Sequence, residues 1–104
     1  MTLIFSNHRF QYEVERLFRN FINEPGIKLS TDRADAQGDF CLTEKKEVPG
    51  GAELSVELVR SGKRFCMSRS VPDNAPEKEQ EREMCILLYK ALREYTGRDL
   101  PWGI

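Results

Sequence analysis

Three cysteines and a single histidine are the residues of this sequence best suited to metal binding or nucleophilic chemistry. Cys41, Cys66 and Cys85 are widely spaced, and no C-x-x-C pair is present. This spacing argues against a disulfide framework and against a zinc or iron–sulfur site built within the chain. We expect reduced thiols that pack as small apolar side chains in a cytoplasmic protein. Cys66, between Arg64 and Arg69, is the one candidate for a reactive thiol, because nearby cations stabilise a thiolate.

Other patterns that could support catalysis are weak. His8 falls at the start of a predicted helix, where a solvated first-turn residue is the usual case, and one histidine leaves little room for a catalytic triad. Residues 48–52, VPGGA, lack both the P-loop lysine and the Rossmann glycine spacing. Four glutamates of a later helix alternate with basic residues and predict a solvated face: Glu77, Glu79, Glu81 and Glu83. We therefore predict no catalytic, cofactor-binding or metal-binding residue in this chain.

One basic cluster stands out around a predicted hairpin turn: Arg60, Lys63, Arg64 and Arg69. A functional interpretation is contact with a phosphate, a carboxylate-bearing ligand or RNA. The alternative, which we favour, is the ordinary protection of an edge strand by charge. Phe65 alternates with the charges, but its pairing with Met67 indicates a core position and not a base-stacking platform.

Composition limits the classes of protein that this chain can represent. Its 104 residues fit one domain, and 39% hydrophobic residues allow one modest core. The net charge of −1 gives no bulk attraction to nucleic acid or to an anionic membrane, so we expect neither partner. The chain start has no basic region before its apolar residues and no small-residue cleavage site, and no apolar run is long enough for a membrane span.

The first third of the chain predicts a strand and an amphipathic helix. Residues 2–7 alternate as a short strand, and Asn7 is a plausible N-cap for a helix over residues 8–23. The apolar residues of this helix recur at one-face spacing: Phe10, Val14, Leu17, Phe18, Phe21 and Ile22. Pro25 and Gly26 then end the helix.

The middle of the chain predicts short strands joined by turns. Residues 27–31 could form an extended edge, and residues 32–39 are polar and predict a loop. Alternation from residue 40 to 44, 54 to 58 and 63 to 71 predicts three strands. The turns are VPGG at 48–51 and SG at 61–62, and the second of these predicts a tight hairpin.

A second amphipathic helix is predicted after residue 74. Asn74 is its expected N-cap, Pro76 suits its first turn and Gly97 is a natural residue to follow its end. Its apolar stripe is Met84, Leu87, Leu88, Ala91, Leu92 and Tyr95. The predicted order is β-α-(β)-β-β-β-α, which favours a two-layer α+β domain. We expect a mostly antiparallel sheet of four to five strands with both helices on one face.

The last residues, LLYKALREYTGRDLPWGI over 87–104, resemble a segment of a known family. The segment is similar to the one just ahead of the radical-SAM core in the oxygen-independent coproporphyrinogen III oxidase (coproporphyrinogen dehydrogenase) family, specifically its HemZ branch. In that family a helix of the form L-Y-x-x-L-x-x-Y-T-G is followed by L-P-W-G. The matching residues here are Leu88, Tyr89, Leu92, Tyr95, Thr96, Gly97, Leu100, Pro101, Trp102 and Gly103.

The resemblance implies a non-catalytic N-terminal domain over residues 1–97 and an exit segment over 98–104 that leads into a radical-SAM domain. Family members bind a [4Fe–4S] cluster through C-x-x-x-C-x-x-C and use S-adenosylmethionine to start oxidative decarboxylation of coproporphyrinogen III to protoporphyrinogen IX, a step of haem and porphyrin biosynthesis. That motif is not in this chain, so no catalytic residue carries over. The implied interdomain contact is Leu100, Pro101 and Trp102, and the basic residues from Arg60 to Arg69 are a possible substrate-facing surface.

Two further functions stay open. The chain could be a stand-alone protein- or RNA-binding module that uses the hairpin from Arg60 to Arg69. It could also be a structural domain that forms dimers. The related radical-SAM branches include haem-trafficking proteins, so the family reaction need not be that of the parent protein.

Overall fold

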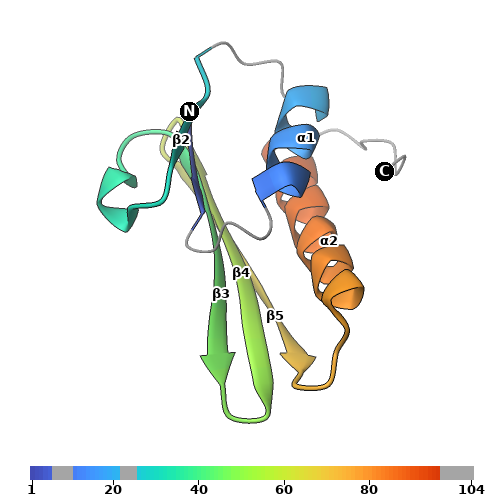
Figure 1. The fold of residues 1–104 in the computed structure, drawn as a ribbon. Coiled ribbons are helices and arrows are strands. Elements are labelled where there is room, and N and C mark those ends of the chain that lie inside the picture. Colours follow the sequence, from blue (N-terminus) through green and yellow to red (C-terminus); the bar gives the residue numbers. More distant parts are fainter. Residues whose placement is uncertain (6–10, 22–25, 97–104) are drawn as a thin grey trace.

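A computed structural model describes residues 1–5, 11–21 and 26–96 of the chain (Figure 1). Five strands form one sheet in the order β2-β1-β3-β4-β5. The strands are β1 (Thr2–Phe5), β2 (Lys28–Ser30), β3 (Phe40–Val48), β4 (Gly51–Arg60) and β5 (Lys63–Pro72). The helices are α1 (Gln11–Phe21) and α2 (Glu77–Thr96), and the 3-10 helix η2 spans Arg33–Asp35. The α+β class is therefore confirmed.

The sheet is mixed, which corrects the expectation of a mostly antiparallel one. β1 lies between β2 and β3 and is parallel to both, whereas β3, β4 and β5 pair antiparallel. A β-α-β connection through α1 brings β2 alongside β1 in the same direction, as such crossovers do. The short turns in the sequence predict the antiparallel pairing of β3, β4 and β5, but they give no information about the direction of β1.

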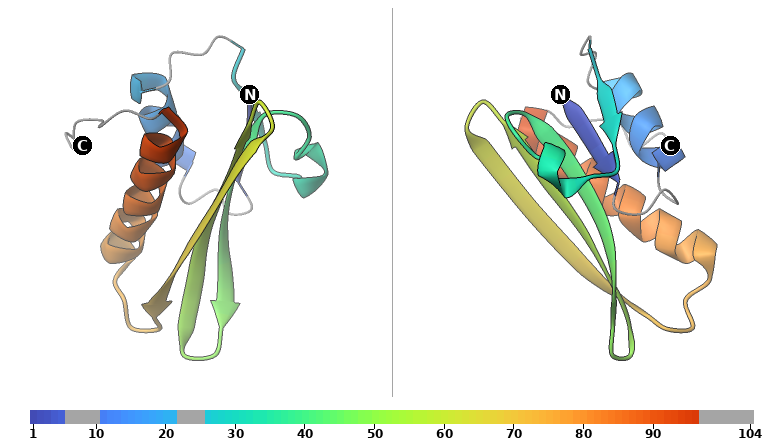
Figure 2. Two further views of the ribbon diagram at one scale, coloured as in Figure 1. Left: turned by 180° about the vertical axis from the view of Figure 1, so that it is seen from behind. Right: turned by 60° about the vertical axis from the view of Figure 1, so that its left-hand side comes forward.

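Both helices lie on the same side of the sheet, and η2 lies on the other side (Figures 1 and 2). We call the helix-covered side the inner face and the opposite side the outer face. The inner core combines alternate strand residues with the apolar stripe of α2, and its largest fully buried members include Phe5, Leu54, Leu58, Leu88 and Leu92. A smaller outer cluster joins Ile4, Phe40 and Leu42, with Ala36 and Val59 packed against it.

Helix boundaries agree with the sequence prediction only in part. α2 begins at Glu77, and the carbonyl of Pro76 accepts hydrogen bonds from the backbone of Glu79 and Gln80. The prediction of Asn74 as the N-cap is therefore wrong by two residues, because Pro76 itself occupies the capping position.

In α1 the stripe residue Phe18 is buried as expected. The predicted cap Asn7, the stripe ends Phe10 and Ile22, and Gly97 lie outside the described residues, and the side chains of Val14, Leu17, Phe21 and Tyr95 are not described.

Two glycines help to fix the two hairpins of the sheet, β3–β4 and β4–β5. In the two-residue turn between β4 and β5, Ser61 and Gly62 have φ values of 50° and 82°. Positive φ at both central positions is the type I′ geometry that matches strand twist. Gly51 begins β4 so close to β5 that a Cβ there would lie 2.0 Å from the carbonyl oxygen of Val71. Both hairpins expected from the turn residues are confirmed.

Candidate functional site

The structure separates the four basic residues of the predicted cluster. All four lie on the β4–β5 hairpin, where Arg60 and Lys63 are partners across the turn. Arg64 is the partner of Val59, which packs in the outer cluster, so it projects from the outer face. Arg69 is the partner of the core residue Leu54 and projects from the inner face. Strand alternation therefore places Arg64 and Arg69 on different faces, and a substrate-facing role for the four residues stays a prediction.

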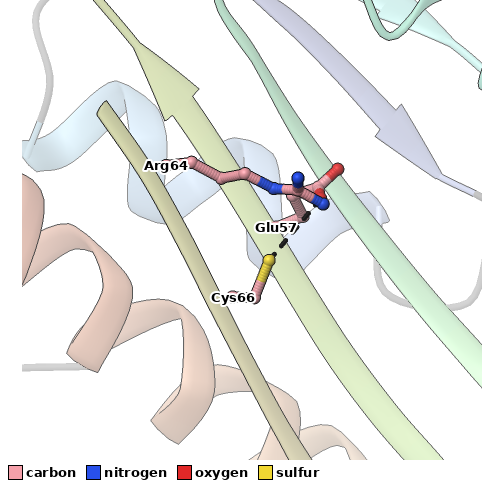
Figure 3. Close-up of polar contacts among 3 residues, drawn as sticks. All are labelled: Glu57, Arg64 and Cys66. Atoms are coloured by element: carbon pink, nitrogen blue, oxygen red, sulfur yellow. Dashed lines mark hydrogen bonds and ion pairs between the residues drawn. The ribbon is translucent and has the colours of Figure 1, made fainter. Parts of the chain in front are cut away.

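Arg64 is held on the outer face by a carboxylate of the neighbouring strand. Its guanidinium forms an ion pair with Glu57 of β4, and the Cys66 thiol lies 3.5 Å from the same carboxylate oxygen (Figure 3). The hydrogen bond to Glu57, then that to Cys66, and the nearby negative charge raise the pKa of Arg64. The cation near Cys66 is thus already engaged by a carboxylate, which also accepts from the thiol. This arrangement differs from the free electropositive setting that activates a thiolate.

Arg69 links the sheet to the second helix. Its Nε lies 2.6 Å from Oε2 of Glu83, whose side chain is only 16% exposed. Glu83 is therefore a structural partner of β5 and not part of a solvated face as predicted. The neighbouring Glu77 and Glu79 are exposed as expected. A residue engaged in this way joins two layers of the fold and is a poor candidate for contact with a ligand.

A polar groove lies on the outer face beside these residues. It has a volume of about 210 Å³ and lies over β3, β4 and β5. Its lining includes Arg33, Leu42, Glu44, Ser55, Val56, Glu57, Cys66, Met67 and Ser68. Arg33 reaches from η2 to Glu44 of β3, with Nη1 3.1 Å from Oε2. Each of the two arginines beside the groove is thus paired with a carboxylate, so an incoming anion would have to displace Glu44 or Glu57.

Sequence reasoning missed Arg33 and Glu44 as parts of this groove. They are separated by ten other residues, and the loop that carries η2 brings them together across the outer face. A local signal was present: the side chain of Asp32 accepts a hydrogen bond from the backbone of Ala34 and caps the 3-10 turn. That pattern marks a turn, but it does not say on which face of the sheet the turn lies.

The three cysteines all lie in the described part of the chain, differ in exposure and form no disulfide there. Cys41 lies in the inner core, and burial raises its pKa to about 12. Cys66 is exposed, and Cys85 is half-buried against the inner core. Among residues 1–5, 11–21 and 26–96, no group of three His, Cys, Asp or Glu side chains could hold a metal ion.

The remaining sequence-predicted residues fall partly outside the described chain. His8, Leu100, Pro101 and Trp102 lie outside the described residues. The helical part of the tail motif is described: Leu88 and Leu92 are fully buried in the inner core, and Tyr89 is 9% exposed. These residues therefore act first as core residues of this domain.

Comparisons with known proteins identify no relative. No protein-family model, no curated protein and no solved structure matches the chain. Within the described part of the chain, no helix is both long and apolar enough to cross a membrane.

Proposed function

We propose that this chain is a non-catalytic N-terminal domain of a radical-SAM protein of the oxygen-independent coproporphyrinogen III oxidase family, in its HemZ branch. The observation that carries the proposal is the sequence of residues 87–104, in which L-Y-x-x-L-x-x-Y-T-G precedes L-P-W-G. The [4Fe–4S] cluster and S-adenosylmethionine would belong to a catalytic domain that follows residue 104. The domain described here would pack against that catalytic domain and position it.

The conformation of α2 supports this proposal. The helix runs to Thr96, directly before the glycine of the motif, and buries Leu88 and Leu92 in the inner core. A tail that follows such a helix starts from a fixed point, because the helix is anchored on the sheet by its apolar stripe. Leu100, Pro101 and Trp102 are then the residues proposed to contact the next domain. Emission from Trp102, the only tryptophan, should shift to shorter wavelength in the longer protein relative to this chain.

The reading frame of the gene is the most direct test of the parent protein. We expect it to continue past Ile104 through a T-G-I-R-P stretch and then into C-x-x-x-C-x-x-C. A stop codon directly after Ile104 would contradict the proposal and favour a stand-alone module. Reconstitution of this chain with iron and sulfide should give no stoichiometric iron–sulfur absorbance, and a stoichiometric cluster would equally contradict it.

A substrate-facing role for the hairpin is a separate part of the proposal. Coproporphyrinogen III carries several carboxylates, which cations steer at long range. Arg64 and Arg69 are engaged by Glu57 and Glu83, whereas Lys63 at the turn is exposed and has no ion-pair partner among the described residues. We therefore place the contact at the hairpin turn and not along the whole of β5.

Titration with coproporphyrin III, followed by amide NMR shifts, tests this role. Shifts should centre on residues 60–64 and should be lost in the variant Lys63→Glu. The matched control is Lys46→Glu, because Lys46 is also exposed but lies far along β3 from this turn. If no residue from 60 to 69 shifts, the substrate-facing role is wrong. The family proposal, which depends on residues 87–104, is tested separately by the reading frame.

The alternative of a protein- or RNA-binding module using the whole hairpin receives less support from the geometry. A nucleic-acid surface needs cations that converge on one backbone. Here Arg64 and Arg69 project from opposite faces and each has a carboxylate partner.

A further inference from the structure

Strand β5 forms one edge of the sheet and is long and regular. Its ten residues pair with β4 at every position from Lys63 to Pro72, so the strand contains no bulge. The opposite edge is β2, which has three residues. Proteins blunt an edge by shortening it, bulging it, placing proline within it or lining it with charged side chains. β2 is blunted by length, whereas β5 has proline only as its last residue and carries charge as its one protecting device, from Lys63, Arg64 and Arg69.

The hairpin turn fixes which backbone groups of β5 point away from β4. A two-residue turn is closed by a hydrogen-bonded pair, here Arg60 and Lys63, and hydrogen bonding then alternates along the strand. The residues with N–H and C=O groups directed to the free edge are Arg64, Cys66, Ser68 and Ser70. No backbone group of the described residues bonds to these four from the free side. The next position, Pro72, has no N–H, and its carbonyl accepts from Ala75.

We propose that this edge binds β5 of a second copy of the chain, antiparallel and with the two-fold axis at Met67. The two five-stranded sheets would then form one continuous sheet across the interface. Antiparallel addition of a strand to a free edge is a common mode of association, in which backbone hydrogen bonds supply affinity. This inference is independent of the proposed function, because it depends only on the edge and its register.

The side chains of β5 select this register over its neighbours. With the axis at Met67, each outer-face residue of one copy lies opposite an outer-face residue of the other: Arg64 faces Ser70 and Cys66 faces Ser68. On the inner face, Phe65 of one copy faces Arg69 of the other. All four edge residues are then used, and no two cations face each other. With the axis at Cys66, Lys63 would face Arg69 of the other copy twice, and like charges directly opposite destabilise a pair. With the axis at Ser68, Arg64 would face Pro72, which has no N–H to donate.

The ion pairs of each copy reduce the repulsion between two basic strands. β5 carries three cations and no anion, which alone would oppose self-association. However, Arg64 is paired with Glu57 and Arg69 with Glu83 of the same chain. The charge around each edge is therefore largely compensated before the copies meet, and this favours a second copy over an acidic peptide as the occupant.

Sedimentation equilibrium of three proteins tests the interface: the natural chain, Ser68→Pro and Ser68→Ala. The natural chain and Ser68→Ala should dimerise with rising concentration between about 1 μM and about 1 mM. Ser68→Pro should stay monomeric at every concentration, because it removes the central N–H of the edge. Proline is tolerated on an edge strand where the N–H faces solvent, so its circular dichroism should match that of Ser68→Ala. A natural chain that is monomeric throughout, or a dimer that Ser68→Pro leaves intact, overturns the proposal.

Crosslinking through Cys66 tests the register without altering the backbone. In the proposed dimer the two Cys66 residues lie on the same outer face, offset by two residues, with their Cα atoms about 8 Å apart. A short bis-maleimide should link them, and peptide mapping should find the Cys66–Cys66 product, which Cys66→Ser abolishes. Failure to form this product at concentrations where dimer is present would overturn the register. A monomer whose residues 64–70 shift only on addition of an acidic extended peptide would assign the edge to another partner and would overturn self-pairing.

Discussion

The two faces of the sheet use the same strands but are stabilised in different ways. On the inner face, alternate residues of β4 are buried together with α2, and Leu54, Leu58 and Leu88 are fully inaccessible. On the outer face, the alternate positions carry Ser55 and Glu57 beside a polar groove, and apolar packing is limited to the small outer cluster around Ile4. Hydrophobic burial therefore sets the stability of the fold, and the outer face is free to carry polar contacts.

The difference also explains why β1 is central. Leu3, Ile4 and Phe5 are all buried, because the inner core covers two of them and the outer cluster covers Ile4. A strand buried on both faces is typical of a parallel position inside a sheet. The longer β4 and β5 extend past the outer cluster, so their outer positions are solvated.

The largest expected effect follows the truncation of a fully buried side chain on the inner face. Leu88→Ala should lower the free energy of unfolding by about 2 to 5 kcal/mol, because it removes a fully buried side chain between α2 and the sheet. The matched control is Leu29→Ala on β2, where the side chain is 45% exposed, and its change should stay within about 0.5 kcal/mol. Urea denaturation followed by circular dichroism measures both. Equal losses in the two variants would show that burial beneath α2 does not dominate the stability of the fold.

The buried thiol of Cys41 on the inner face should make the stability of the fold depend on pH. Burial raises the pKa of Cys41 to about 12 from an ordinary value of 9.0. The folded state therefore keeps this proton where the unfolded state loses it, so stability is fully present below pH 9. It should fall by about 1.4 kcal/mol per pH unit between pH 9 and pH 12. The contribution of Cys41 is the difference in the free energy of unfolding between the natural chain and the variant Cys41→Ala, which lacks the thiol, measured at each pH.

Thiol labelling provides an independent check of the same contrast. At pH 8 a disulfide reagent should react quickly with the exposed Cys66 and should reach Cys41 only after unfolding. Equal stability slopes in the natural chain and Cys41→Ala, or rapid labelling of Cys41 in the folded state, would contradict its placement in the inner core.

A smaller effect is expected in the outer cluster. Ile4→Val removes one methylene from a side chain that is fully buried under the loop carrying η2, and it should cost about 0.5 to 1.5 kcal/mol. Ile27→Val removes the same group from a half-buried position and should cost less. The two denaturation midpoints are compared directly. A smaller loss for Ile4 than for Ile27 would show that the outer cluster is loosely packed.

The sequence predicted the local elements better than their arrangement. Period-two alternation from residue 40 onward and the SG turn at 61–62 identified the antiparallel strands, because hairpins depend on neighbouring residues. The parallel pairing of β1 was missed, although its three consecutive apolar residues are the signal of a strand buried on both faces. The groove was missed because Arg33 and Glu44 meet only through a loop that crosses the outer face. The partners of Arg64 and Arg69 also depend on strand register, which composition does not reveal.

The smallest expected effects concern the two ion pairs, one on each face. A double-mutant cycle with Arg69→Gln and Glu83→Gln should give a coupling of about 0.5 to 1 kcal/mol, because Glu83 is largely shielded from water. The equivalent cycle with Arg64→Gln and Glu57→Gln should give a smaller coupling, since the Arg64 side chain is 66% exposed and water competes for it.

Salt then separates the two pairs further. Added salt screens exposed charges more strongly than shielded ones, so the Arg64–Glu57 coupling should disappear first as ionic strength rises. A larger or more salt-resistant coupling on the outer face would mean that the groove beside Glu57 is as dry as the helix-covered side. In that case the polar outer contacts would contribute to the stability of the fold, and the division between a stabilising inner face and a solvated outer face would fail.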